Sequence, residues 1–361
     1  MKATTRIAII GIALAALVHT GYGQIQILDT RLIPPGAPQD DVMKTLDAVE
    51  PRIAINAINT PGSPFSSVYD ILVPGSYYLT ENMMGAQATT GIHVFASNVT
   101  IDLNGYGLIG STNTSPNNGP GIVIETNAHS VVIQNGFVTL FQGGIISKAT
   151  NTTFRNIRCT HNNSDGLRSS TFSQVYDCSF LHNANDGVEV GDHSRVAGVL
   201  ARKNNYGIVV GPGSLVQNCV VRENTNHGIR LNGRGSRVSS CVSEKNNIGI
   251  SIDANRCTAV NNTCAENTSE GIASGILGST EYTDCVIDGN HVSANGSRGI
   301  LVTGTDNIVV RNYSYDNATA FVVLASNQMG TVVSGIDAVG IAGSSGGNLD
   351  ATVGPWSNFA R

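Results

Sequence analysis

Charged and aromatic residues are both scarce in this 361-residue sequence. Asp, Glu, Lys and Arg together make up 13%, against about a quarter in an average protein, and Phe, Trp and Tyr make up 6%. Lys and Arg form no cluster, and the formal net charge is -5. This balance argues against nucleic acid or an anionic membrane surface as the main partner. Neutral or hydrated polymers fit the composition better.

Long apolar runs are also absent, with one exception near the start. Residues 1–23 carry Lys2 and Arg6, then an apolar run over 7–18, then small residues before Gln24. The run is too short to cross a bilayer, so the pattern predicts a secretory signal peptide. We therefore expect export to the periplasm or outside the cell, with cleavage near Gln24 and no transmembrane segment in the mature protein.

Glycine, in contrast, is abundant, with 41 residues, and a short motif that begins with glycine recurs about every 21 residues. The motif is Gly, an aliphatic residue, a variable residue and usually a second aliphatic residue. An Asn precedes it by three to five residues, and the steps between these Asn are 21, 21, 20, 22 and 21; they are Asn162, Asn183, Asn204, Asn224, Asn246 and Asn267. A fixed period of this length indicates a solenoid.

Each period shows short apolar alternation broken by Gly, Asn and Ser, which is the pattern of strands and turns. A leucine-rich repeat has a similar period, but it needs many Leu, and this region is Leu-poor. We therefore predict an all-β fold, a single-stranded parallel β-helix of about ten coils with a cap at each end. Two aliphatic rows should point inward, namely Ile208, Ile229 and Ile250, and Val210, Leu231 and Ile252.

The other repeated positions also have expected roles. The glycines should permit the sharp corner before each strand, and the Asn should accept left-handed backbone and stack their amides along the solenoid. Outward positions such as Ser251 should be exposed. Polar loops at 111–120 and 274–282 should protrude between coils.

Four regions are expected along the chain. They are a signal peptide (1–23), an N-terminal cap (24–65), the β-helix (66–325) and a C-terminal cap or tail (326–361). The first cap is rich in Pro and contains one helical pattern over 40–50. Caps are expected because an open edge of a parallel sheet invites other chains. Trp356 and Phe359 are predicted to plug the final coil rather than to form a platform that stacks sugars.

Several segments resemble a group of secreted bacterial proteins with a right-handed parallel β-helix, within the pectate-lyase-like superfamily. The segments span 43–52 (Met-Lys-Thr-Leu-Asp-Ala-Val-Glu-Pro-Arg), 75–80 (Gly-Ser-Tyr-Tyr-Leu-Thr), 99–105 (Val-Thr-Ile-Asp-Leu-Asn-Gly) and 354–359 (Gly-Pro-Trp-Ser-Asn-Phe). The resemblance covers nearly the whole mature chain. It implies right-handedness and export, and it implies no settled activity.

The seven Cys could form disulfides in an exported protein, but their positions favour another interpretation. Cys178, Cys219 and Cys241 precede the marker Asn by five residues, and Cys159 and Cys264 precede theirs by three, so both sets fall in inward rows. Stacked free thiols in the core are therefore favoured, although a Cys219–Cys241 bridge between adjacent coils stays open. Spacings typical of metal sites do not occur, so no metal or cofactor is predicted.

One polar cluster stands out on the outward positions beside the glycine-led strands. One column of the repeat holds Asp165, Asp186, Tyr206 and His227, and the other holds Arg168, Glu189, Val209 and Arg230. Two carboxylates on neighbouring coils suit acid–base work on glycosidic bonds, and their like charges should raise one pKa. We predict Asp165, Asp186, Glu189 and His227 as catalytic residues, and Arg168, Tyr206 and Arg230 as residues that bind a polysaccharide.

Two alternatives stay open at this point. The columns could be a solvated charge row in which Arg168 pairs with Glu189, in a non-catalytic surface or matrix scaffold. The motifs of known β-helix enzymes do not decide the matter. Asn226-His227-Gly228 lacks the first Gly of the Gly-His-Gly found in polygalacturonases, and residues 189–193 are a loose echo of the Trp-Ile-Asp-His of pectate lyases. If the protein is an enzyme, it is a polysaccharide lyase or a glycoside hydrolase.

Overall fold

Each period of the sequence folds into one coil with three short strands, because its apolar pairs are separated by Gly, Asn and Ser at the turns. The computed structural model describes residues 52–63, 65–86, 88–111, 119–275, 282–334, 341–342 and 355–360. The expected signal peptide, the helical pattern over 40–50 and the tips of both predicted loops lie outside these residues. A helix able to cross a bilayer does not occur among the residues described.

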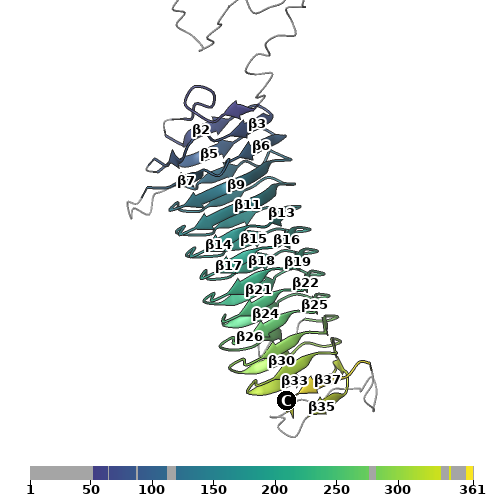
Figure 1. Ribbon diagram of the computed structural model, residues 1–361. Coiled ribbons are helices and arrows are strands. Elements are labelled where there is room, and N and C mark those ends of the chain that lie inside the picture. Colours follow the sequence, from purple (N-terminus) through teal and green to yellow (C-terminus); the bar gives the residue numbers. More distant parts are fainter. Residues whose placement is uncertain are drawn as a thin grey trace, which may run out of the picture. The chain divides into compact units, whose positions relative to one another are not determined.

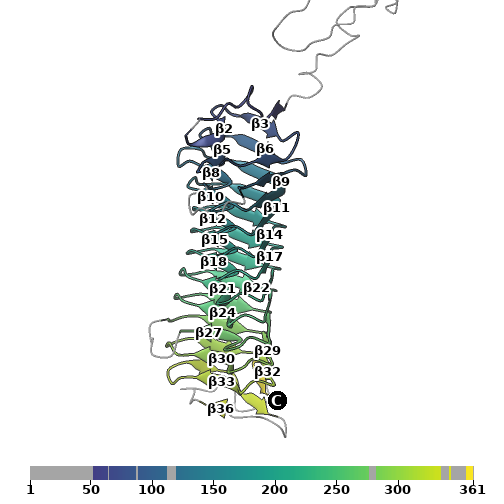
Figure 2. The ribbon, with the colours of Figure 1, turned by 90° about the vertical axis from the view of Figure 1, so that its left-hand side faces the viewer.

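The first strands of successive coils pair in parallel as one 13-stranded sheet, here called the first-strand sheet. Figure 2 shows it as a continuous column. Its strands are β2 (Ser67–Ile71), β5 (Thr90–Val94), β8 (Ile122–Ile124), β10 (Ile145–Ser147), β12 (Leu167–Ser169), β15 (Val188–Val190), β18 (Ile208–Val210), β21 (His227–Leu231), β24 (Ile248–Ile252), β27 (Ile272–Ser274), β30 (Arg298–Val302), β33 (Thr319–Val323) and β36 (Ile341–Ala342).

The second and third strands of each coil form two neighbouring columns, stacked as in Figure 1. Because β9 (Val132–Thr139) and β11 (Thr153–Thr160) run through both columns, the two count as one 24-stranded sheet. The other strands of the second-strand column are β1 (Ile53–Ala54), β3 (Gly75–Tyr78), β6 (Val99–Asp102), β13 (Gln174–Tyr176), β16 (Arg195–Ala197), β19 (Leu215–Gln217), β22 (Arg237–Ser239), β25 (Thr258–Val260), β28 (Val286–Asp288), β31 (Ile308–Val310) and β34 (Gln328–Met329).

The third-strand column ends in an order that differs from the order of the sequence. Its other strands are β4 (Met83–Met84), β7 (Gly107–Ile109), β14 (Ser179–Leu181), β17 (Leu200–Arg202), β20 (Val220–Arg222), β23 (Val242–Glu244), β26 (Thr263–Ala265), β29 (His291–Ser293), β32 (Tyr313–Tyr315), β37 (Asn358–Ala360) and β35 (Val332–Ser334). Strand β37 pairs with β32 on one side and with β35 on the other. Strand pairing thus begins before residue 66 and continues beyond residue 325.

The interior confirms the two predicted aliphatic rows. Ile208, Ile229 and Ile250 stack in register, and these side chains and those of the second row are fully buried. Burial of each such side chain contributes roughly 1.5–3 kcal/mol. One outward position differs from expectation, because Ser251 is only 1% exposed and its Oγ donates to Asp253 Oδ1 at 2.6 Å.

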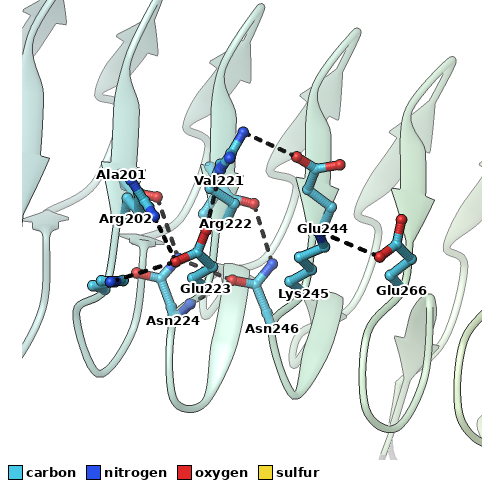
Figure 3. A network of polar contacts seen from close by, with 11 residues as sticks. Ala201, Arg202, Val221, Arg222, Glu223, Asn224, Glu244, Lys245, Asn246 and Glu266 are labelled. Carbon is cyan, nitrogen blue, oxygen red and sulfur yellow. Dashed lines mark hydrogen bonds and ion pairs between the residues drawn. The ribbon is translucent and has the colours of Figure 1, made fainter.

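The marker Asn form a buried ladder along the turn after the third strands (Figure 3). Asn224 donates from both its backbone N and its Nδ2 to Asn246 Oδ1, at 2.9 Å each, and its Nδ2 also reaches Ala201 O at 3.3 Å. The same side-chain link recurs between Asn295 and Asn317 at 2.8 Å. The amides are thus paired within the protein, as a structural role for the Asn requires.

The backbone at this turn corrects the expected roles of Gly and Asn. The residue before each ladder Asn, and not the Asn itself, adopts positive φ, for example 56° at Lys203 and 57° at Glu223. The strand-leading glycines have negative φ, but a Cβ at Gly187 would lie 2.6 Å from Gly207 O and 2.8 Å from Asn204 Nδ2. Glycine is therefore required there by the close approach of the next coil.

The seven cysteines are free and buried, as the favoured interpretation predicts. Cys219 N donates to Cys241 Sγ at 3.5 Å, and the thiols are not joined. The same row continues with Asn262, whose Oδ1 accepts a hydrogen bond from Cys241 N at 3.0 Å. Burial raises the pKa of Cys178 to about 12, so this thiol stays protonated and unreactive at neutral pH.

The predicted plug is wrong for both aromatic rings. Trp356 is 48% exposed and Phe359 is 42% exposed, whereas Asn358 and Ala360 are buried. The reason is that 358–360 forms strand β37, and alternation along a strand turns Phe359 outward when its two neighbours face inward.

Candidate functional site

The predicted site lies on the outer face of the first-strand sheet, over strands β12, β15, β18 and β21. Strand register places Arg168 beside Glu189, Glu189 beside Val209 and Val209 beside Arg230. Asp165, Asp186 and Tyr206 each come directly before the glycine that leads into their strand, and His227 is in the same position at the start of β21. The structure therefore brings both predicted columns together on four consecutive coils.

The carboxyl groups of Asp165 and Asp186 are buried, although the sequence places both residues at outward positions of the repeat. Asp165 is 6% exposed and Asp186 is 7% exposed. Asp165 Oδ1 accepts a hydrogen bond from Asn185 Nδ2 at 2.6 Å and another from the backbone N of Asp186 at 3.1 Å. Asp186 Oδ1 is buried and has no hydrogen-bond partner among the described residues. A buried oxygen without a partner costs about 1–3 kcal/mol, so it calls for an explanation.

The environment of Asp186 favours its protonated form. Burial raises the pKa of Asp186 to about 7, and the nearby charges of Asp165 and Glu189 add to that rise. The positive charges of Arg168 and Arg230 oppose it. A carboxyl group that keeps its proton up to neutral pH can serve as a general acid. Asp165 beside it accepts two hydrogen bonds, as a carboxylate does.

Three ring or guanidinium groups continue the cluster toward β24. Burial lowers the pKa of His227, and Nδ1 of this ring is buried without a hydrogen-bond partner in the described part of the chain. His227 is therefore neutral at pH 7. The Tyr206 ring meets it edge-on with centroids 5.3 Å apart, and the Arg230 guanidinium lies 5.7 Å from the centroid of Tyr206.

Both predicted binding arginines already have carboxylate partners. Arg168 Nε lies 3.1 Å from Glu189 Oε2, and both side chains are partly exposed. Arg230 Nε lies 2.6 Å from Asp253 Oδ2, in a pair that is more deeply buried. A surface pair such as Arg168–Glu189 contributes at most about 1 kcal/mol, so a ligand could replace it at small cost.

Two acidic residues on this face were not predicted from the sequence. Asp253 follows β24 and holds Arg230, and Glu270 is a buried residue whose Oε1 lies 2.6 Å from Arg298 Nη1. The repeat is sufficient to predict Glu270 as a member of this column, because Glu270 precedes Gly271 just as Asp186 precedes Gly187. Within the described ranges, no three His, Cys, Asp or Glu side chains gather in a way that could hold a metal ion.

A family model that matches most of the sequence shows the family of the chain. The family model described as "Right handed beta helix region" matches residues 79–214 and 206–353. The chain therefore belongs to this family, and its solenoid is right-handed. No curated protein matches the sequence.

Solved structures share the fold at low sequence identity. The Dettilon tailspike protein (gp208) has a TM-score of 0.58 at 16% identity, covering 68% of this chain and 58% of its own. The ORF18 protein of Geobacillus virus E2 has a TM-score of 0.55 at 16% identity, over 71% and 60%. The pectate lyase Pel9A has a TM-score of 0.50 at 16% identity, over 67% and 72%. This chain thus spans less than two thirds of the tailspike, and the likeness concerns the fold.

Proposed function

We propose that this protein binds a polysaccharide along the outer face of the first-strand sheet and cleaves it by acid–base catalysis. The observation that carries the proposal is the buried carboxyl of Asp186, with an unpartnered Oδ1 and a pKa raised to about 7, next to Asp165. Groups with strongly shifted pKa values cluster at functional sites. One of the similar structures is a pectate lyase, an enzyme named for a polysaccharide, which supports the substrate class.

The side chains have distinct roles in either of two reactions. In hydrolysis, Asp186 gives its proton to the leaving glycosidic oxygen, and Asp165 or Glu189 takes a proton from the attacking water. In elimination, neutral His227 takes the proton from carbon, and Asp186 again protonates the leaving oxygen. Arg168, Tyr206 and Arg230 would hold the polymer, since arginine and tyrosine offer donors and flat surfaces to sugars.

A panel of polysaccharides tests the proposal. Product formation is followed by reducing ends, which detect both reactions, and by the absorbance of unsaturated products, which detects elimination alone. At least one substrate should be cleaved, and Asp186→Asn should reduce turnover by at least about 100-fold, the usual contribution of a general acid. The control is Glu266→Gln, which removes an exposed carboxylate on another face.

Two outcomes of this panel would overturn the catalytic assignment. Activity that persists when Asp165→Asn, Asp186→Asn and His227→Ala are combined would show that the reaction takes place elsewhere. Absence of turnover on every substrate would instead favour a non-catalytic scaffold. The engagement of Arg168 and Arg230 in ion pairs is the observation that supports this second candidate.

We also propose that residues 1–23 direct export and that residues 24–65 and 326–361 protect the ends of the solenoid. The support is the apolar run after Lys2 and Arg6 and the open parallel edges that any β-helix has. N-terminal sequencing of the protein recovered from expressing bacteria should read from a residue near Gln24. An intact Met1 on folded protein would refute the leader.

A further inference from the structure

A groove lies away from the candidate site, along the bend between the second and third strands. Its volume is about 280 Å³, and it is lined by residues of four successive coils, among them Gly105, Asn135, Phe137, Asn156, Arg158 and Asp177. The bend arises because one residue per coil adopts positive φ, as at Asn135 (60°), Asn156 (49°) and Asp177 (53°). This concavity is independent of the first-strand sheet.

Two arginines flank the bend without carboxylate partners. Arg155 and Arg158 stand on either side of Asn156, both are exposed, and neither forms an ion pair within the described residues. Eight other arginines do form such pairs, namely Arg52, Arg168, Arg202, Arg222, Arg230, Arg256, Arg298 and Arg311. Figure 3 shows this arrangement for Arg202 and Arg222, which meet Glu223 and Glu244.

Aromatic rings hold these unpaired guanidinium groups in place. Arg158 lies 5.4 Å from the centroid of Phe137, and Arg155 lies 5.6 Å from that of Tyr176. Arg195, a third arginine without an ion pair in the described part, lies 5.7 Å from the same Tyr176 ring. Stacking leaves the edge of a guanidinium, with its donors, open to a ligand. A protein with a net charge of -5 thus carries, beside this bend, three arginines without an ion pair in the described residues.

We propose that this groove binds an acidic sugar unit, with Arg158, which lines the groove, and Arg155, which stands beside it next to Asn156, as the ligands of its carboxylate. The planar fork of arginine matches a carboxylate in a two-point contact. Asn156 and Asp177, which also line the groove, can hydrogen-bond to sugar hydroxyls. This inference rests on the proposed function and narrows it to a polysaccharide that contains uronic acid, held at a second place on the solenoid.

The charge pattern distinguishes this ligand from a nucleic acid. Binding of a nucleic-acid backbone requires basic residues that follow several phosphates in succession. Here the arginines beside the groove without an ion pair in the described residues are three, on β11 and β16, and Asp177 places a negative charge inside the groove. A volume of about 280 Å³ lies at the lower end for small-ligand pockets and suits one or two sugar units.

Titration calorimetry with oligogalacturonate, its methyl ester, oligomannuronate and duplex DNA tests the proposal. At least one of the two acidic oligosaccharides should bind, and its affinity should fall with added salt. Arg158→Ala and Arg155→Ala should each weaken binding about tenfold, the loss expected for one charge-assisted contact. Arg158→Lys should be intermediate, because it keeps the charge and loses the fork.

Arg237→Ala is the matched control, since Arg237 is exposed, forms no ion pair in the described residues and lies on β22, away from the groove. The proposal is overturned if neither acidic oligosaccharide binds, if the methyl ester or DNA binds equally well, or if Arg237→Ala weakens binding as much as Arg158→Ala. Measurements in the Asp186→Asn background separate the two sites. Binding that survives there but is lost in Arg158→Ala supports the groove even if no cleavage is found.

Discussion

Asp186 illustrates how burial gives a single residue on the outer face of a solenoid its chemistry. A carboxyl whose pKa is raised from 3.8 to about 7 makes its full contribution to stability below about pH 4, where it is protonated in both the folded and unfolded states. That contribution is lost as the pH rises toward 7, because the unfolded chain ionises first. The loss is on the order of 4 kcal/mol.

The Asp186→Asn variant should therefore differ from the native protein in its pH dependence. The amide does not ionise, so the variant should gain stability relative to the native protein between pH 4 and pH 8, by about 3 kcal/mol. Urea unfolding at several pH values measures this difference. Glu266→Gln, on the other face, should leave the native profile unchanged, and parallel profiles for Asp186→Asn and native protein would refute the raised pKa.

For single residues, the sequence predicts which side chains lie in the same column better than it predicts how buried they are. The period alone placed Asp165, Asp186 and His227 in one column, because the register of a β-helix is set by equal spacing. Strand alternation then suggested that outward side chains are exposed, and it failed for Asp186 and for Ser251. Ser251 contacts Asp253 in the turn after its own strand, and Asp186 contacts Asp165 on the preceding coil, and strand alternation describes neither contact.

The ladder turn is the element on which the stack of coils depends most directly. Asn224 Oδ1 accepts hydrogen bonds from both N and Nδ2 of Asn204, at 2.9 and 3.2 Å. The Nδ2 of Asn224 donates to Asn246 Oδ1 and to Ala201 O (Figure 3). Removal of this amide leaves the buried Asn204 N without its acceptor and takes one hydrogen bond each from Asn204 Nδ2, Ala201 O and Asn246 Oδ1. A buried group left without a partner costs about 1–3 kcal/mol.

We accordingly expect Asn224→Ala to lower the free energy of unfolding by at least about 3 kcal/mol. Denaturant unfolding checks the value. Thr225→Ala is the control, since the Thr225 side chain is exposed on the same turn, and it should change stability by less than about 0.5 kcal/mol. Similar losses in the two variants would show that the ladder contributes little.

The elements themselves were predictable, but the reasons for some residues were not. The Gly-led strands and inward rows follow from the alternation of apolar residues. The need for glycine at Gly187 follows from the nearness of Gly207 O and Asn204 Nδ2 in the next coil. A sequence shows that a position is always Gly without showing which atom excludes a side chain there.

At the scale of the whole solenoid, the repeat predicted the class of fold and gave about ten coils, whereas the first-strand sheet has 13 strands. Strands β2 to β33 of this sheet lie within the predicted range 66–325, although β2 has no leading glycine and Phe321 takes the place of the first aliphatic residue in β33, and β36 lies beyond that range. Right-handedness came from the family resemblance, because the period carries no information about chirality.

The insertion of β37 between β32 and β35 makes the order of assembly differ from the order of synthesis. Coils before it can be added one by one as the chain emerges, since each new strand finds the edge of the last one. Strand β35 emerges before β37 but has no partner in its column until β37 has joined β32. We therefore expect this end of the solenoid to be completed only when residues 358–360 join β32 to β35.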